Sequence, residues 1–263
     1  MSLFSSIGRA TCEACSGMRD TCAVLGETLS EFAGLFTHPK RFRFRDFALA
    51  FQRAAFEGMP VMIGVGFLLG LILAFQSAAA LSTYGVESYV ANMLAIALFR
   101  ELGPLVTAIL LAGRSASAFA AEIGAMKVDE ELDALVTMGL APVRFLVLPR
   151  ILAAVLAMPV LTIFVELAAL AGGALVLKGV GIPAAVYWEG VSSSCDAFMI
   201  VFGLSKAALF GLLVGFVGCL RGMRTKTTSD GVGVSATAAV VGGIVSVAVA
   251  DGILAVICHV WGV

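Results

Sequence analysis

The fold of this chain is set by a long apolar stretch at residues 145–177, which reads FLVLPRILAAVLAMPVLTIFVELAALAGGALVL. Arg150 and Glu166 are the charged residues within it. A helix needs about 20 mostly apolar residues to cross a hydrocarbon core that is ~30 Å thick. The stretch exceeds that length, and Pro159 near its middle favours a tilted or bent helix. These residues therefore predict a transmembrane helix.

Four other apolar stretches are long enough to cross a membrane, at roughly 60–81, 89–112, 198–220 and 235–261. The chain of 263 residues is 60% hydrophobic and 13% charged, with a mean hydropathy of +1.03. Soluble globular domains are about 45–50% apolar and about 25% charged. We therefore expect an all-α polytopic membrane protein with five spans, and not a soluble enzyme.

The N-terminal region differs from the rest of the chain. Residues 1–39 contain no spanning stretch and no apolar core typical of a cleaved signal peptide. They favour at most a surface helix around Cys22–Phe36. Residues 42–58 place Phe44, Phe47 and Phe51 at helical spacing with arginines between them, as in a helix that lies in the membrane interface. We therefore assign residues 1–39 to an N-terminal segment and residues 40–263 to one membrane domain.

The distribution of lysine and arginine predicts the topology, because cytoplasmic loops retain positive charge. Five such residues lie in 40–53, four in 114–150 and three in 221–226. The alternate loops carry none near Glu87 and one, Lys178, before the fourth span. Five spans then place the N-terminus in the cytoplasm and the C-terminus outside.

Several classes of function are not favoured. No Gly-rich P-loop pattern occurs, so we expect ATP hydrolysis in a partner and not in this chain. Cys12 and Cys15 form a single C-x-x-C pair without a second pair or nearby histidines, which indicates incidental thiols and no metal site. The net charge of −1 and the pI of about 6.1 show no basic excess for nucleic acid.

Charged residues inside the apolar stretches are candidate functional groups, because an unpaired charge at membrane depth is costly. Arg100 and Glu101 lie in the second stretch, with Lys206 and Glu166 as possible counter-charges. Asp251 in the fifth stretch is ambiguous. Structural ion pairs and direct contact with a substrate both explain such residues.

A polar segment between the second and third stretches predicts an amphipathic cytoplasmic helix over Glu122–Gly139, ended by Gly139 and Pro142. Its apolar face comprises Val128, Leu132, Leu135 and Val136. Glycines at Gly66 and Gly70, and again from Gly211 to Gly222, predict close helix packing within one subunit or between two.

Two nearly continuous segments carry a family resemblance: FRELGPLVTA at 99–108 and AGRSASAFAAEIGAMKVDEELDAL at 112–135. They resemble the MlaE/YrbE permease family, and the similarity extends over about 42–260. Its members are permeases of ABC transporters that work with MCE-domain proteins to move phospholipids or other lipids. The family usually carries arginines where this chain has Val234 and Ala238.

The resemblance implies a homodimer in the bacterial inner membrane, with cytoplasmic ATPase subunits that bind ATP and Mg and an MCE-domain protein on the far side. It implies a lipid pathway near Arg100, Glu101 and Lys206. It also implies an ATPase-coupling segment made by Glu122, Gly124, Met126, Lys127, Val128, Glu130, Glu131, Leu132 and Leu135.

Two other functions are compatible with parts of the sequence. An ion-gradient-driven secondary transporter would use Arg100, Glu101, Glu166 and Lys206 as a relay, but no inverted repeat is evident. A membrane scaffold would explain the glycines but not the buried charges. The sequence identifies neither the lipid nor the direction of transport.

Overall fold

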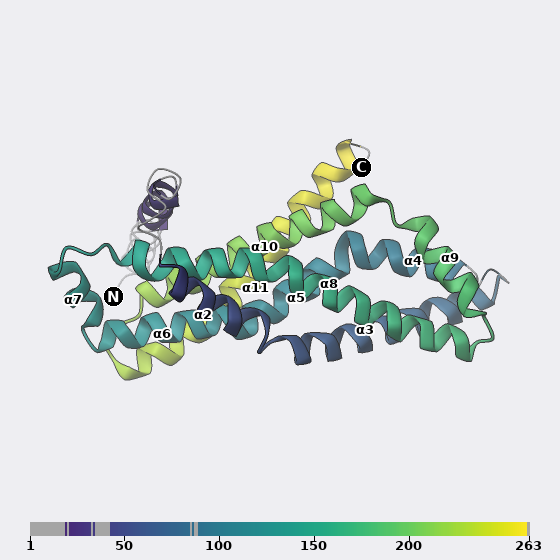
Figure 1. Cartoon of the computed structure of the whole chain (residues 1–263), viewed down its shortest axis with the longest axis horizontal. Coiled ribbons are helices and arrows are strands. Elements are labelled where there is room, and N and C mark those ends of the chain that lie inside the picture. The colour runs from purple at the N-terminus through teal and green to yellow at the C-terminus, as the bar shows by residue number, and fades with distance from the viewer. Residues whose placement is uncertain are drawn as a thin grey trace, which may run out of the picture.

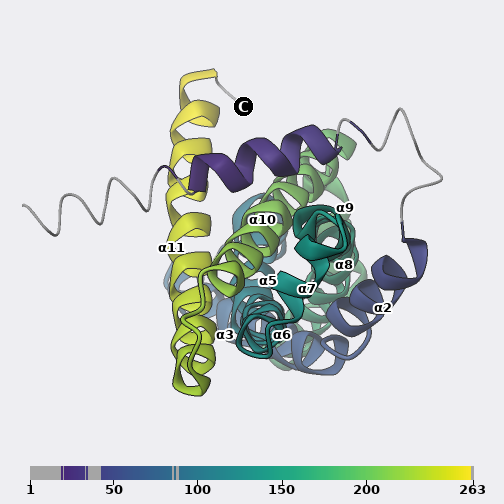
Figure 2. The same ribbon diagram turned by 90° about the vertical axis from the view of Figure 1, so that its left-hand side faces the viewer.

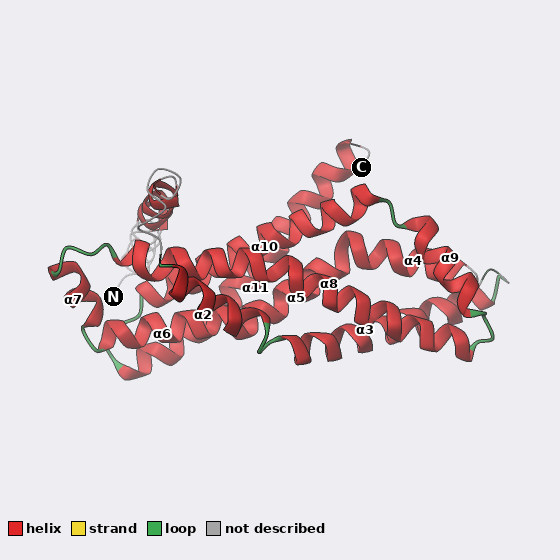
Figure 3. Ribbon diagram, in the orientation of Figure 1, coloured by secondary structure: helices red, strands yellow, loops and turns green. Residues whose placement is uncertain are grey.

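The computed structural model describes residues 19, 21–32, 34, 43–84, 86 and 89–261. In these ranges the regular elements are helices (Figures 1 and 3), and five of them are long and apolar enough to cross a membrane. The chain is thus an all-α polytopic membrane protein, as the sequence predicts.

The interfacial helix α2 (Phe44–Ala55) leads into the first span, α3 (Met59–Ser82). The second span is a composite in which two π-helical turns interrupt the α-helix. The third span is preceded by another π-helical turn, and a short helix α9 (Ala184–Ser194) precedes the fourth span, α10 (Ala197–Met223). The last span is α11 (Ser229–Trp261). The remaining elements are α4 (Val90–Ala97), η3 (Leu98–Leu102), α5 (Gly103–Leu111), η4 (Ala112–Ala116), α6 (Ser117–Val128), α7 (Glu131–Thr137), η5 (Val143–Val147) and α8 (Leu148–Gly179).

Helix α8 lies at the centre of the bundle and packs along α3, α10 and α2 (Figure 1). Its contact with α3 depends on glycine. A Cβ atom at Gly66 would lie 2.6 Å from the carbonyl oxygen of Val165, and one at Gly70 would overlap the carbonyl oxygen of Ala169. These glycines therefore bring two spans of the same subunit together. The alternative that Gly66 and Gly70 join two subunits is wrong.

The segment between the second and third spans differs from the single helix predicted for Glu122–Gly139. The second span continues without a loop to Val128, and a left-handed residue, Glu130 with φ of 59°, separates it from α7. The extension is stable because α6 packs against α10 and α11. Helical periodicity could not reveal this break, because both pieces keep the same apolar spacing.

Helix α9 was not predicted from the sequence. It begins after Pro183, and the Tyr187 hydroxyl donates to the Leu170 carbonyl oxygen at 2.8 Å. Burial raises the pKa of Tyr187 to about 12. The helix was missed because its sequence is short and its apolar residues show no clear period.

The predicted N-terminal surface helix is present over 21–32 and crosses the end of the bundle (Figure 2). Thr28, Leu29 and Phe32 line an apolar cavity of about 450 Å³ against α8 and α10. Glu31 pairs with Arg144 at 3.5 Å, which fastens this helix beside η5. Cys12 and Cys15 lie outside the described residues.

Candidate transport site and cytoplasmic segment

A cluster of charges lies inside the bundle, where three spans meet. Lys206 on α10 is buried, with 1% of its side chain exposed. Its Nζ atom pairs with Asp251 Oδ1 on α11 at 2.6 Å and with Glu101 Oε2 on η3. The same ammonium lies 5.8 Å from the centre of the Phe210 ring. The ammonium is thus held between two carboxylates and one aromatic face.

The cluster lies near the middle of the membrane. Glu101, Lys206 and Asp251 each lie roughly ten residues from one end of their span, at Val90, Ala197 and Trp261, which is ~15 Å at the helical rise of ~1.5 Å per residue. Two carboxylates and one ammonium carry a formal charge of −1. Glu101 keeps 36% of its side chain exposed, so the cluster presents a carboxylate to its surroundings. Such a group at this depth indicates a functional site.

The π-helical turn η3 places Arg100 and Glu101 within the second span. A π-helical turn contains an extra residue and commonly marks a functional position. The side chain of Glu101 reaches Lys206. Among the residues that the structure describes, Glu101 and Asp251 both pair with Lys206 and not with Arg100. Arg100 is half-buried and has a contact of its own. The structure thus brings together two of the three residues predicted for the lipid pathway.

Glu166 does not take part in this cluster. It is buried on α8, and its Oε1 atom lies 2.6 Å from the point where a Cβ of Gly103 would be. Among the described residues Glu166 forms no ion pair, so its suggested role as a counter-charge to Arg100 is not found, whereas Lys206 does pair with Glu101. Asp251, which the sequence left ambiguous, is the second acidic partner of Lys206. An acidic residue inside the fifth span was the available signal.

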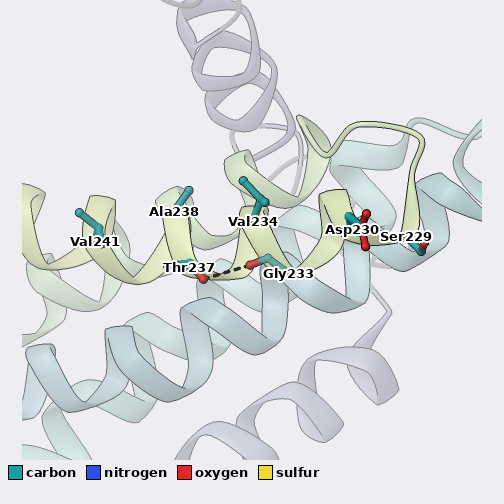
Figure 4. A pocket seen from close by; sticks show the side chains of 7 residues that line it. All are labelled: Ser229, Asp230, Gly233, Val234, Thr237, Ala238 and Val241. Carbon is teal, nitrogen blue, oxygen red and sulfur yellow. Dashed lines mark hydrogen bonds between the residues drawn. The ribbon is translucent and has the colours of Figure 1, made fainter.

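A long open groove follows the first half of α11 (Figure 4). It has a volume of about 840 Å³ and is lined by Ser229, Asp230, Gly233, Val234, Thr237, Ala238 and Val241. Val234 and Ala238, where the family resemblance predicts arginines, also line a neighbouring cavity of about 340 Å³ together with Arg221, Arg224 and Lys226. Three cations at and just after the end of α10 thus lie beside Val234 and Ala238 of α11.

The polar residues of α6 point into the subunit. Glu122 pairs with Arg53 of α2 and with Arg150 of α8, each at 2.9 Å. Lys127 Nζ donates to the carbonyl oxygen of Met223 at 2.7 Å, at the end of α10. A Cβ at Gly124 would lie 2.6 Å from Thr225 Oγ1. This part of the predicted coupling segment therefore fastens α6 to its neighbours.

Helix α7 and the turn before it are more open. Leu132 is buried and Leu135 is half-buried, whereas Glu130 and Glu131 are exposed. Two apolar side chains also face outward, since Val136 is 58% exposed and Met138 is 65% exposed. Of the other residues predicted to couple, Val128 is half-buried and Met126 packs against the core. The most exposed part of the predicted coupling segment is thus α7 with the turn before it.

Five candidate spans and a charged cluster buried among three of them define a polytopic membrane protein. Comparison with known families makes this specific. The family model described as Permease MlaE matches residues 47–257. This chain belongs to the MlaE permease family, and it is a permease subunit of the ABC transporter class.

The chain is similar to several curated proteins. It is 34% identical to the intermembrane phospholipid transport system permease protein MlaE of Haemophilus influenzae, over 70% of this chain and 72% of that protein. A probable ABC transporter permease of Rickettsia typhi is 34% identical over 71% of this chain and 72% of its own length. The chloroplastic protein TRIGALACTOSYLDIACYLGLYCEROL 1 of Arabidopsis thaliana is 32% identical over 77% of this chain and 58% of its own length.

Proposed function

We propose that this chain moves phospholipid or a related lipid between membranes, as the transmembrane part of an ABC transporter in the bacterial inner membrane. The observation that carries the proposal is the ion cluster of Lys206, Glu101 and Asp251 at mid-membrane depth in a chain of this family. Lipid headgroups are charged, and they need polar groups where the hydrocarbon offers none. The similarity to an intermembrane phospholipid transport permease of Haemophilus influenzae supports the same substrate class.

Force comes from a separate cytoplasmic ATPase, which binds ATP and Mg. The exposed apolar side chains Val136 and Met138 beside the carboxylates of Glu130 and Glu131 suit a groove on such a partner. Positive charge on the same side supports a cytoplasmic position for α7 and for the N-terminus. An MCE-domain protein would receive or deliver lipid on the opposite side.

Two copies of the chain form the transport unit in this proposal, with α11 at the interface. This helix exposes an apolar stripe comprising Val234, Val241, Val245, Val249, Ile253, Val256 and Val260. Gly252 lies between Val249 and Ile253 and has no neighbour within 4 Å of a Cβ, so it would permit close approach of a second helix. A lipid cavity between two subunits would then include the open side of Glu101.

A gradient-driven secondary transporter remains the competing class for a chain with buried charges. No observation on the described residues favours it over the ABC class, to which the family assigns this chain. Co-purification of a P-loop ATPase with this chain supports the proposal. Transport that persists without ATP but collapses with the ion gradient contradicts it.

The direct test uses the purified complex in liposomes that contain labelled phospholipid. The double variant Arg100→Ala, Glu101→Ala should reduce ATP-dependent lipid transfer about tenfold or more, because it removes two charged groups from the pathway. The variant Glu189→Gln, at an exposed position on α9, is the matched control. Normal transfer by a correctly folded double variant contradicts the assigned pathway.

A second test addresses α7. Charge reversal at Glu130 and Glu131 to Lys should weaken ATPase association, while membrane insertion stays normal. Association is measured by co-purification at two salt concentrations, because exposed charge contacts weaken with salt. An unchanged complex with unchanged coupling excludes these carboxylates from the docking rim.

A further inference from the structure

The interfacial helix α2 has an apolar side that faces away from the bundle. Phe44 is 69% exposed and Phe56, just after the helix, is 60% exposed, whereas Ala54 and Ala55 are buried against the spans. Exposed aromatic side chains on an interfacial helix rest in the boundary between headgroups and acyl chains. Any displacement of α2 therefore acts directly on the adjacent leaflet.

Two ion pairs connect α2 to the second span, one from α2 itself and one from the turn at 56–58 that joins α2 to α3, here called the elbow. Arg53 Nη1 of α2 lies 2.9 Å from Glu122 Oε1 of α6. Arg114 Nη2 of η4 lies 3.0 Å from Glu57 Oε2 in the elbow, and its Nη1 atom donates to the carbonyl oxygen of Arg53 at 3.2 Å. In the Arg53–Glu122 pair the cation belongs to α2, whereas in the Arg114–Glu57 pair the cation belongs to the second span. This crossed arrangement fixes the register, because sliding would bring like charges together.

The elbow itself has little freedom beside Arg114. A Cβ at Gly58 would lie 2.7 Å from Arg114 Nη1 and 3.1 Å from the carbonyl oxygen of Ala54. The guanidinium thus lies against the backbone where α2 ends and α3 begins. A shift of η4 must move this backbone with it.

The middle of α2 is separated from α6 by a cavity of about 240 Å³, lined from α2 by Asp46, Leu49, Ala50 and Arg53. At this cavity Glu122 pairs with Arg53 of α2 through one carboxylate oxygen. Its second carboxylate oxygen lies 2.9 Å from Arg150 Nη2 of α8. The ion pairs, and not a continuous apolar seam, therefore connect α2 to α6. Neither pair reaches the charged cluster at Lys206, so a role in contacting lipid there is not implied.

We propose that Glu122 and Arg114 are positioning residues that make the interfacial helix α2 move as one body with the cytoplasmic end of the second span. A displacement delivered at α7 then shifts a helix in the cytoplasmic leaflet as well as the spans. This inference rests on the proposed function, because it requires a partner that moves α7. It gives Glu122 a different role from the ATPase contact expected from the sequence.

The decisive measurement is the distance between spin labels in the complex with its ATPase. Gln52 on α2 and Ala118 on α6 are both exposed, and genetically encoded keto amino acids at these positions accept labels without replacing native cysteines. The Gln52–Ala118 distance should be the same without nucleotide and with trapped ATP. The distance between Gln52 labels on the two copies of the subunit should change. A Gln52–Ala118 distance that changes in an active complex overturns the inference, and so does a fixed Gln52–Gln52 distance.

The functional measurement is the amount of lipid moved per ATP hydrolysed. The charge-neutralising pair Glu122→Gln, Arg114→Gln should lower this ratio about fivefold or more, while ATPase association and hydrolysis continue. In that variant the Gln52–Ala118 distance should become sensitive to ATP. The swap Glu57→Arg, Arg114→Glu restores one pair with reversed polarity, so it should recover more of the ratio than either single change. Glu189→Gln on α9 serves as the control.

The outcomes separate this inference from the proposed function. Absence of an ATPase or of ATP-dependent transport refutes the proposed function. Normal ATP-dependent transport with a normal ratio in the folded Gln variant refutes the positioning role alone. If the Gln pair does not fold, the wild-type label distances still decide the question.

Discussion

Helices α8 and α11 are equally apolar over their most hydrophobic stretches, yet they differ in how deeply those stretches are buried within the subunit. Half of the most apolar stretch of α8 is buried inside the subunit, whereas only 11% of the corresponding stretch of α11 is buried. Apolar composition thus indicates that a helix spans the membrane, but not whether it is buried in the core of the subunit. What distinguishes α8 is the fit of small residues: Gly172 faces the backbone of Phe67, whereas a Cβ at Gly252 of α11 would meet no atom within 4 Å. One span is fixed by packing, and the other keeps a face for lipid or a second copy.

The largest effect is expected where α3 packs on α8. Gly70→Leu places a side chain against the backbone of Ala169 and should separate the two helices, at a cost of more than about 3 kcal/mol. We expect loss of the folded protein in detergent, measured by size-exclusion chromatography and thermal unfolding.

Gly64→Leu on the same helix is the matched control, because a Cβ at that position has no neighbour within 4 Å. It should fold normally. Equal stability of the two variants would show that α3 and α8 are not held by glycine contact, and the distinction between α8 and α11 would lose its basis.

The number of spans and their approximate limits could be predicted from the sequence, because hydropathy and length are local properties. The partners of each glycine could not, since Gly211 and Gly218 lie on the same face of α10 but meet different elements, Ala154 of α8 and Ala116 of η4. Helical periodicity likewise could not locate the break at Glu130, where the backbone turns left-handed.

The candidate site was predicted only in part. A charge at membrane depth is visible in any sequence, so Glu101 and Lys206 were identified. Their meeting with Asp251 depends on how α10 and α11 pack, which has no local signal. The pairing of Glu122 within the subunit likewise could not be predicted from local sequence, because its arginine partners come from α2 and α8.

A smaller effect is expected at the ion pair that ties α11 to the rest of the bundle. Lys206→Met removes the ammonium between Glu101 and Asp251 and leaves two carboxylates without their cation. Breaking such a buried pair costs about 3 kcal/mol. We expect a lower unfolding temperature and strongly reduced lipid transfer, measured in detergent and in liposomes.

The control for this prediction is the double variant Lys206→Met, Asp251→Asn, which removes one of the stranded carboxylates. It should recover part of the stability, because fewer charges remain unpaired, but not the transport. Recovery of both would mean that the cluster holds α11 in place and has no part in the lipid pathway.

The smallest effect tests the free face of α11 itself. Gly252→Ala adds a methyl group in open space and should be neutral or stabilise the isolated subunit by up to ~1 kcal/mol, because alanine favours the helix. The same change at Gly172 of α8 should destabilise by about 1–3 kcal/mol, since its methyl group meets the backbone of Phe67. Thermal unfolding of both variants in the same detergent gives the difference directly. If Gly252→Ala leaves the subunit folded but lowers the fraction of dimer in light scattering, a second copy covers this face of α11. Equal destabilisation by the two substitutions would instead show that α11 is packed within the subunit as closely as α8.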